Sequence, residues 1–128
     1  MSAVCSVSLD PPLILACLDA GSNTLGAIRE TGSFTVNYLR RGCEAVAFDF
    51  ASKSRAKFEG RAWELASIGV GGPVLREHIA AYAVCRVADL IRAGDHVIAV
   101  GEVHHGEALE EHDALAYARQ RFFTAVGA

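Results

Sequence analysis

This sequence has no hydrophobic run long enough to cross a membrane. Runs such as residues 13–18 fall far short of the roughly 20 apolar residues that a membrane helix needs. The N-terminus also lacks a basic segment followed by an apolar core, which is the pattern of a signal peptide. We therefore expect no membrane role.

An excess of positive charge is missing as well. The chain has 12 Lys and Arg residues against 15 Asp and Glu residues, a net charge of −3, and the two signs are mixed along the sequence. Nucleic-acid-binding domains typically carry a basic patch. Nucleic acid is therefore not an expected partner.

Paired cysteine motifs are absent. The chain has four cysteines with no C-x-x-C pair, each in apolar surroundings: Cys5, Cys17, Cys43 and Cys85. This arrangement favours small core residues in a reducing compartment over a disulfide framework. We expect a cytoplasmic protein.

Several common catalytic and metal-binding patterns are missing too. The sequence has no G-x-S-x-G elbow and no P-loop. Gly69-x-Gly71 lacks the third glycine of a dinucleotide fingerprint, and Pro73 follows it where a helix should begin. His104 and His105 are adjacent on a predicted strand, so their side chains point to opposite faces. No metal site is expected.

The chain is rich in apolar residues and has the length of a single domain. A chain of 128 residues is expected to form one domain, spanning residues 1–128, that buries on the order of two-thirds of its unfolded surface. The hydrophobic fraction of 52% exceeds the usual ~45–50%. Some apolar surface is therefore expected to remain for a partner chain.

Strand patterns outnumber helix patterns. Helices are predicted at residues 22–30, between a Ser or Thr cap and Gly32, and at residues 43–51. The predicted strands share β-branched, aromatic or continuous apolar residues: residues 13–18, 34–39, 63–67, 79–90, 96–105 and 116–125. Helices inserted irregularly between strands favour a β-barrel with helical insertions over a doubly wound sheet.

The segment before residue 13 combines small side chains with a forced turn. Pro11 and Pro12 cannot donate backbone hydrogen bonds, so the chain must turn or follow an edge there. Upstream, small residues and serines suit the close approach of a flat ligand and hydrogen bonds to a phosphate or ring carbonyl. Serines at alternate positions are equally typical of an ordinary half-exposed strand.

His96 follows a Gly-Asp turn and opens a long apolar strand. Small molecules commonly bind at strand ends and barrel mouths. A neutral imidazole there could donate a hydrogen bond to an amide, and histidine titrates near neutral pH. The alternative is a turn histidine paired with Asp95, and the residues alone leave both interpretations open.

Two segments carry cations that suit a planar or phosphorylated ligand. Lys53, Arg55 and Lys57 alternate, so in an extended chain they would face one way and could hold a phosphate. Residues 117–122 mix aromatic and basic side chains in a way that suits stacking on a ring. A solvated loop and an ordinary edge strand are the respective alternatives.

Taken together, these pieces resemble the flavin reductase-like family, the small reductase components of two-component flavin monooxygenases. The resemblance follows the family's order over nearly the whole chain. Its motifs are residues 3–12, 22–24, 34–37, 50–51, 57–60, 85–87, 94–96 and 117–122. The resemblance implies an FMN-binding split β-barrel and a homodimer. It also implies hydride transfer from NADH or NADPH to FMN or FAD, with reduced flavin passed to a partner monooxygenase.

The resemblance also implies roles for individual residues. His96 would contact the nicotinamide or the exposed face of the flavin, and hydride transfer would need no general base. The residues implied to bind the flavin are Ser2, Ala3, Val4, Cys5 and Ser6 as a loop along the ring edge, Ser22, Thr24 and Lys57 at the phosphate, Phe58 in the same motif as Lys57, Asn37 as a support of the pocket, and Tyr117 and Arg121 beside His96.

One departure from the family pattern suggests a second hypothesis. Family members carry another strand and a Gly/Met-Thr segment before the position where this sequence begins. A domain shortened in this way would expose a strand edge and lack part of its flavin loop. The alternative function is therefore a non-catalytic flavin-binding or assembly protein of the same fold.

Overall fold

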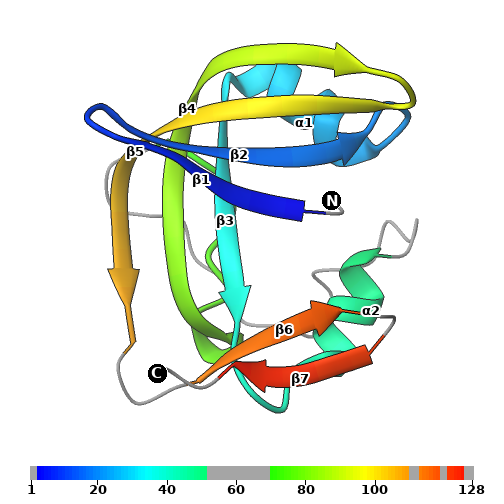
Figure 1. The fold of residues 1–128 in the computed structure, drawn as a ribbon, viewed down its shortest axis with the longest axis vertical. Coiled ribbons are helices and arrows are strands. Elements are labelled where there is room, and N and C mark those ends of the chain that lie inside the picture. The colour runs from blue at the N-terminus through cyan, green and yellow to red at the C-terminus, as the bar shows by residue number, and fades with distance from the viewer. Residues whose placement is uncertain (1–2, 52–69, 110–112, 119–120, 126–128) are drawn as a thin grey trace.

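A computed structural model describes residues 3–51, 70–109, 113–118 and 121–125. Five antiparallel strands form one sheet in the spatial order β1-β2-β5-β4-β3, and β6 and β7 form a separate hairpin (Figure 1). The strands are β1 (Ala3–Leu9), β2 (Pro12–Asp19), β3 (Ser33–Leu39), β4 (Ile79–Ala93), β5 (His96–Ala108), β6 (Ala114–Ala118) and β7 (Arg121–Ala125). The helices are α1 (Asn23–Thr31), α2 (Glu44–Ala51) and the short 3₁₀ turn Arg76–His78. The predicted mainly β architecture with helical insertions is confirmed.

The N-terminal segment is an edge strand and not a loop. β1 pairs antiparallel with β2, from Ala3 opposite Cys17 to Leu9 opposite Pro12, with a register shift between Ser6 and Ser8. Pro11 lies in the turn between β1 and β2 and Pro12 is the first residue of β2, two positions where a missing N–H donor is tolerated. The prediction that residues 2–6 form a loop is therefore wrong for residues 3–6, because small alternating side chains also suit an edge strand.

Both predicted helices are present, and the first has the expected caps. The Ser22 hydroxyl accepts a hydrogen bond from the Leu25 N–H at 3.1 Å. Gly32 ends α1 with φ of 72°, a left-handed conformation that glycine adopts without steric cost. Leu25 and Ile28 form the buried side of α1, which faces β2 and β3. The helix therefore covers one half of the sheet.

The hairpin of β4 and β5 is longer than predicted, and it bends. One half of β5 pairs with β2 through residues 96–102, whereas β3 pairs with the opposite end of β4. Figure 1 shows β5 crossing the molecule beside β2 and then turning toward the other end of the sheet. At the bend Gly101 is buried, and a Cβ placed there would lie 2.6 Å from Cζ of Phe34. Only a residue without a side chain allows this ring to approach.

The C-terminal part is a hairpin rather than the single strand predicted for residues 116–125. β6 and β7 pair antiparallel, with Ala118 opposite Arg121, and Arg40 bridges to Ala114. Periodicity alone could not separate one long strand from two short ones. The predicted strand at residues 63–67 lies outside the described residues.

Two buried clusters follow from the bend. One lies under α1 and contains Leu18, Leu25, Phe34 and Val97. The other lies at the far end of β4 and contains Val46 of α2, Val74 and Tyr82. Across the described segments, no helix is long and apolar enough to span a bilayer.

The bend gives a test of the fold. Gly101→Ala is expected to lower the free energy of unfolding by about 1–3 kcal/mol, because the new methyl group overpacks against Phe34 and Cys85. The matched control is Gly26→Ala in α1, which meets nothing within 4 Å and should raise stability by about 0.5–1 kcal/mol. Urea unfolding measures both changes. Equal effects of the two substitutions would contradict the packing argument.

Candidate functional site

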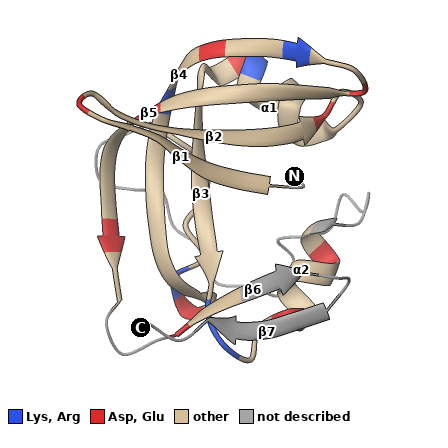
Figure 2. Cartoon of the chain, viewed as in Figure 1, with Lys and Arg blue, Asp and Glu red and all other residues tan. Residues whose placement is uncertain are grey.

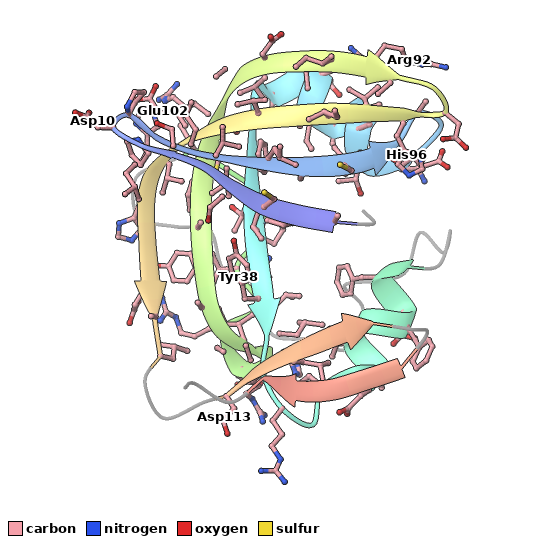
Figure 3. All side chains as sticks on the ribbon, viewed as in Figure 1. Asp10, Tyr38, Arg92, His96, Glu102 and Asp113 are labelled. Carbon is pink, nitrogen blue, oxygen red and sulfur yellow. The ribbon has the colours of Figure 1, made fainter. Side chains whose placement is uncertain are left out.

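His96 lies at the end of the β4–β5 hairpin, beside the last residue of β2 (Figure 3). Gly94 makes the hairpin turn with φ of 63°. The Ala20 N–H donates to the Asp95 carbonyl oxygen at 2.9 Å, and the Ser22 N–H donates to the Asp19 carbonyl oxygen at 3.0 Å. The chain leaving β2 for α1 therefore packs against the turn, which brings the start of α1 toward His96.

The His96 side chain is paired with the residue before it. Its Nδ1 lies 2.8 Å from Oδ1 of Asp95, and the imidazole is 34% exposed. This hydrogen bond, with the charge of His96, lowers the pKa of Asp95 from its ordinary value of 3.8. An ionised carboxylate can only accept, so this contact favours the tautomer of His96 that carries its proton on Nδ1. The hydrogen bond that a neutral His96 is expected to donate to an amide stays a prediction, and the contact with Asp95 fits the alternative of a turn histidine.

Strand register places Ala3 and Cys5 on the same face of the sheet as His96. Residues directly opposite in a sheet share a face, and so do residues two apart in a strand. Ala3 pairs with Cys17, and Cys17 pairs with Ile98, two residues from His96. We call this side, which is opposite to the Leu18 cluster, the outer face. It contains Ala3, Cys5, Leu15, Cys17, Ile91, His96, Ile98 and Val100.

The other predicted residues of β1 are placed differently. Val4 points to the opposite side and packs against the buried cluster under α1. Ser6 is exposed at the start of the register shift. β1 is also an edge strand, so half of its backbone N–H and C=O groups face away from β2. A row of such groups beside small side chains fits the edge of a flat ring that carries both donors and acceptors.

Ser22 and Thr24 are at the N-terminus of α1. Ser22 caps the helix, and Thr24 is exposed in the first turn, which carries no acidic residue. The first N–H groups of a helix have no partner within it and favour an anion. Acidic residues nevertheless occur nearby, at the end of β2 and in the β4–β5 turn (Figure 2). The cation predicted to balance a phosphate, Lys57, lies outside the described residues, as do Ser2 and Phe58.

Asn37 is engaged away from His96. Its Nδ2 donates to the Pro73 carbonyl oxygen at 3.0 Å, and its Oδ1 accepts from the Leu75 N–H at 3.0 Å. On the same face of β3, the Thr35 hydroxyl bonds both the C=O and the N–H of Gly72. These side chains fix residues 71–75 against the sheet. The support of a flavin pocket by Asn37 stays a prediction.

The structure does not bring Tyr117 and Arg121 to His96 within one chain. Their strands, β6 and β7, form a hairpin bridged to Arg40, next to the start of β4. His96 pairs with Ala93 at the opposite end of β4. Their side chains are outside the described part of the structure. Tyr117 and Arg121 would lie beside His96, as predicted, only if they came from a second copy of the chain.

Sequence reasoning missed the polar stripe on β3. Ser33, Thr35 and Asn37 alternate along the strand, and Ser33 Oγ accepts from the Gly71 N–H at 3.0 Å. The period-two pattern of polar side chains is visible in the sequence, but their partners lie more than 30 residues away. His105 is also in contact with another side chain, since Tyr82 Oη lies 3.0 Å from its Nε2.

The thiols differ in exposure more than predicted. Cys43 and Cys85 are buried, and burial raises the pKa of Cys85 to about 11. Cys5 is exposed on the edge strand, so the expectation of a core position is wrong for this residue. All four are free thiols.

A family model described as "Flavin reductase like domain" matches residues 1–125. The chain belongs to this family. It is 45% identical over 105 residues to the flavin reductase (NADH) of Kitasatospora aureofaciens, which is 82% of this chain and 54% of that relative. A second curated relative is covered over only 37% of its length. The chain thus spans about half or less of these relatives.

Solved structures of this family have the same fold. The NADH:FAD oxidoreductase SgcE6 of Streptomyces globisporus C-1027, in complex with NAD and FAD fragments, superposes with a TM-score of 0.87 at 28% identity, covering 96% of this chain and 73% of that one. Nitrilotriacetate monooxygenase component B of Mycobacterium thermoresistibile superposes with a TM-score of 0.85 at 30% identity, covering 96% and 68%. These likenesses confirm the expected split-barrel fold.

The role of Asn37 in holding residues 71–75 can be tested by itself. Asn37→Ala is expected to lower the free energy of unfolding by about 1–3 kcal/mol, because the buried Leu75 loses its hydrogen-bond acceptor. Asn23→Ala removes an exposed amide and should change stability by less than about 0.5 kcal/mol. Thermal unfolding without flavin measures both. If Asn37→Ala left the stability unchanged, the Asn37 amide would not stabilise residues 71–75.

Proposed function

We propose that this chain uses NADH or NADPH to reduce FMN or FAD and supplies reduced flavin to a partner monooxygenase. The observation that carries the proposal is the juxtaposition of His96 with small residues of the β1 edge strand on one face, in a chain of this family. A relative crystallised with NAD and FAD fragments and another named as a monooxygenase component support the substrates and the partner.

The protein's contribution in this reaction is binding and orientation. Bound flavin accepts the hydride that the dihydronicotinamide ring gives up, so the ligands carry the chemistry. The free backbone edge of β1 would orient the flavin ring, and the N-terminus of α1 would bind its phosphate. His96 would hold the nicotinamide at reacting distance through Nε2, without acting as a general base.

The proposal is tested by mixing the purified chain with NADH and FMN and following absorbance at 340 nm, then repeating with NADPH and FAD. Flavin-dependent loss of the signal is expected. Flavin binding without loss of NADH would instead support the non-catalytic flavin-binding alternative. No binding and no turnover with any pair would contradict both functions.

The variant His96→Ala tests the proposed contact of His96 with the nicotinamide. It is expected to lower kcat/KM for NADH about tenfold, because one hydrogen bond to the substrate is lost, while flavin affinity changes little. His104→Ala is the control, since that exposed histidine lies near Glu102 on another part of β5. Unchanged kinetics in His96→Ala would remove His96 from the site.

We further propose that the chain forms a homodimer through its outer face. This face is apolar yet incompletely buried, and Ile91 remains 44% exposed. Such a face at a barrel surface is typical of an interface between subunits. Within one chain, the β6–β7 hairpin lies at the opposite end of β4 from His96. A second copy that covers part of the outer face would bring its own β6–β7 hairpin to this His96.

The dimer predicts a mass of twice 13.6 kDa in sedimentation equilibrium. Ile91→Lys should raise the dissociation constant at least about tenfold, because burying an isoleucine contributes roughly 1.5–3 kcal/mol. Leu9→Lys is the control, since Leu9 is 96% exposed at the end of β1 and adjoins Asp10, which lies at the end of the molecule opposite to His96 (Figure 3). A monomeric wild-type chain would overturn this proposal.

A cytoplasmic location is also proposed. All four cysteines are free, including the exposed Cys5. Thiols persist in compartments that glutathione and thioredoxin keep reduced.

A further inference from the structure

Asp95 pairs with His96, and the turn that carries Asp95 is held by two hydrogen bonds. The Ala20 N–H donates to the Asp95 carbonyl oxygen at 2.9 Å, and Nε of Arg92 donates to the Gly94 carbonyl oxygen at 2.7 Å. The Asp95 side chain itself is 93% exposed. The turn therefore presents a carboxylate at a defined place, 2.8 Å from Nδ1 of His96, although water surrounds it.

The other charged groups near the ring leave this pairing intact. Asp19 is the cross-strand neighbour of His96 on β2, but its Oδ1 already accepts from the Gly21 N–H at 2.8 Å. On β4, Arg92 attracts the Asp95 carboxylate and contributes to its lowered pKa. Asp95 is therefore ionised at neutral pH and acts only as an acceptor.

We propose that Asp95 is a positioning residue that holds His96 as the Nδ1–H tautomer, so that Nε2 accepts a hydrogen bond from an N–H donor of the bound nucleotide. The carboxamide NH₂ of a nicotinamide ring is a donor of this kind. This inference rests on the proposed function for the identity of the ligand. The tautomer itself does not depend on it.

An acceptor at Nε2 makes the site prefer a nicotinamide that carries an N–H donor. A reduced nicotinamide nucleotide in which a methyl ketone replaces the carboxamide offers no N–H, so only its methyl group or its carbonyl oxygen could face the lone pair of Nε2. Such an analogue leaves the acceptor unpaired, which a site built around a hydrogen bond disfavours. With the opposite tautomer, Nε2–H would donate to that carbonyl, and the analogue would be accepted.

The tautomer can be measured without any ligand. Long-range ¹H–¹⁵N correlation spectra at pH 8 are expected to show His96 as Nδ1–H in the wild-type chain and shifted toward Nε2–H in Asp95→Ala. Asp95→Asn keeps an acceptor oxygen and should retain part of the Nδ1–H form. Asp89→Ala is the charge-matched control, because Asp89 bonds the adjacent Leu90 N–H on the same hairpin. An Nε2–H wild type, or a tautomer that Asp95→Ala leaves unchanged, would overturn the proposal.

Kinetics then test the consequence for the substrate. Asp95→Ala is expected to raise KM for NADH about two- to fivefold with kcat little changed, because exposed pairs of this kind contribute modestly. The same variant should discriminate less than the wild type against the methyl ketone analogue, whereas Asp89→Ala should keep the wild-type ratio. A ratio unchanged in Asp95→Ala would contradict the specificity role. Absence of wild-type NADH oxidation would contradict the proposed function and leave the spectroscopic result to decide the tautomer.

Discussion

The contact between the Phe34 ring and the backbone of Gly101 is the constraint on which this architecture depends. β3 can approach β5 this closely only because Gly101 has no side chain, and Cys85 closes the same space from β4. The long β4–β5 hairpin bends at this contact. In one half of the hairpin β5 pairs with β2, and in the other half β4 pairs with β3.

The bend also determines where the candidate site forms. The half of the hairpin beside β2 ends at Asp95 and His96, next to the chain that enters α1. The strict alternation of side chains then separates the functions of the two faces. Leu18 and Val97 fill the core, while His96 and Cys17 remain on the outer face. A ligand at this face would therefore lie on a rigid, hydrogen-bonded sheet, which is the usual way that a fold orients reacting groups.

A second support comes from the polar stripe of β3. Ser33, Thr35 and Asn37 bond the backbone of residues 71–75 as a neighbouring strand would, although those residues form no strand. Gly71, with φ of 88°, lies so close to Thr35 and Val84 that a side chain would not fit. The segment that leads into β4 is thus held in place by side chains instead of a strand ladder, which anchors the start of β4.

Local sequence signals by themselves determined much of the secondary structure of this protein. The Ser22 cap, Gly32, the paired prolines and the Gly-Asp turn predict α1, the β1–β2 turn and the β4–β5 hairpin, because each signal acts within a few residues. The ordered motifs also indicate the family. Only the tertiary structure decided that residues 3–6 form an edge strand, that Asn37 bonds Pro73 and Leu75, and that the imidazole of His96 meets Asp95 through Nδ1. Pairing partners, register and side-chain direction depend on contacts between residues far apart in the chain or on the geometry of a turn, and neither is encoded in local sequence periodicity.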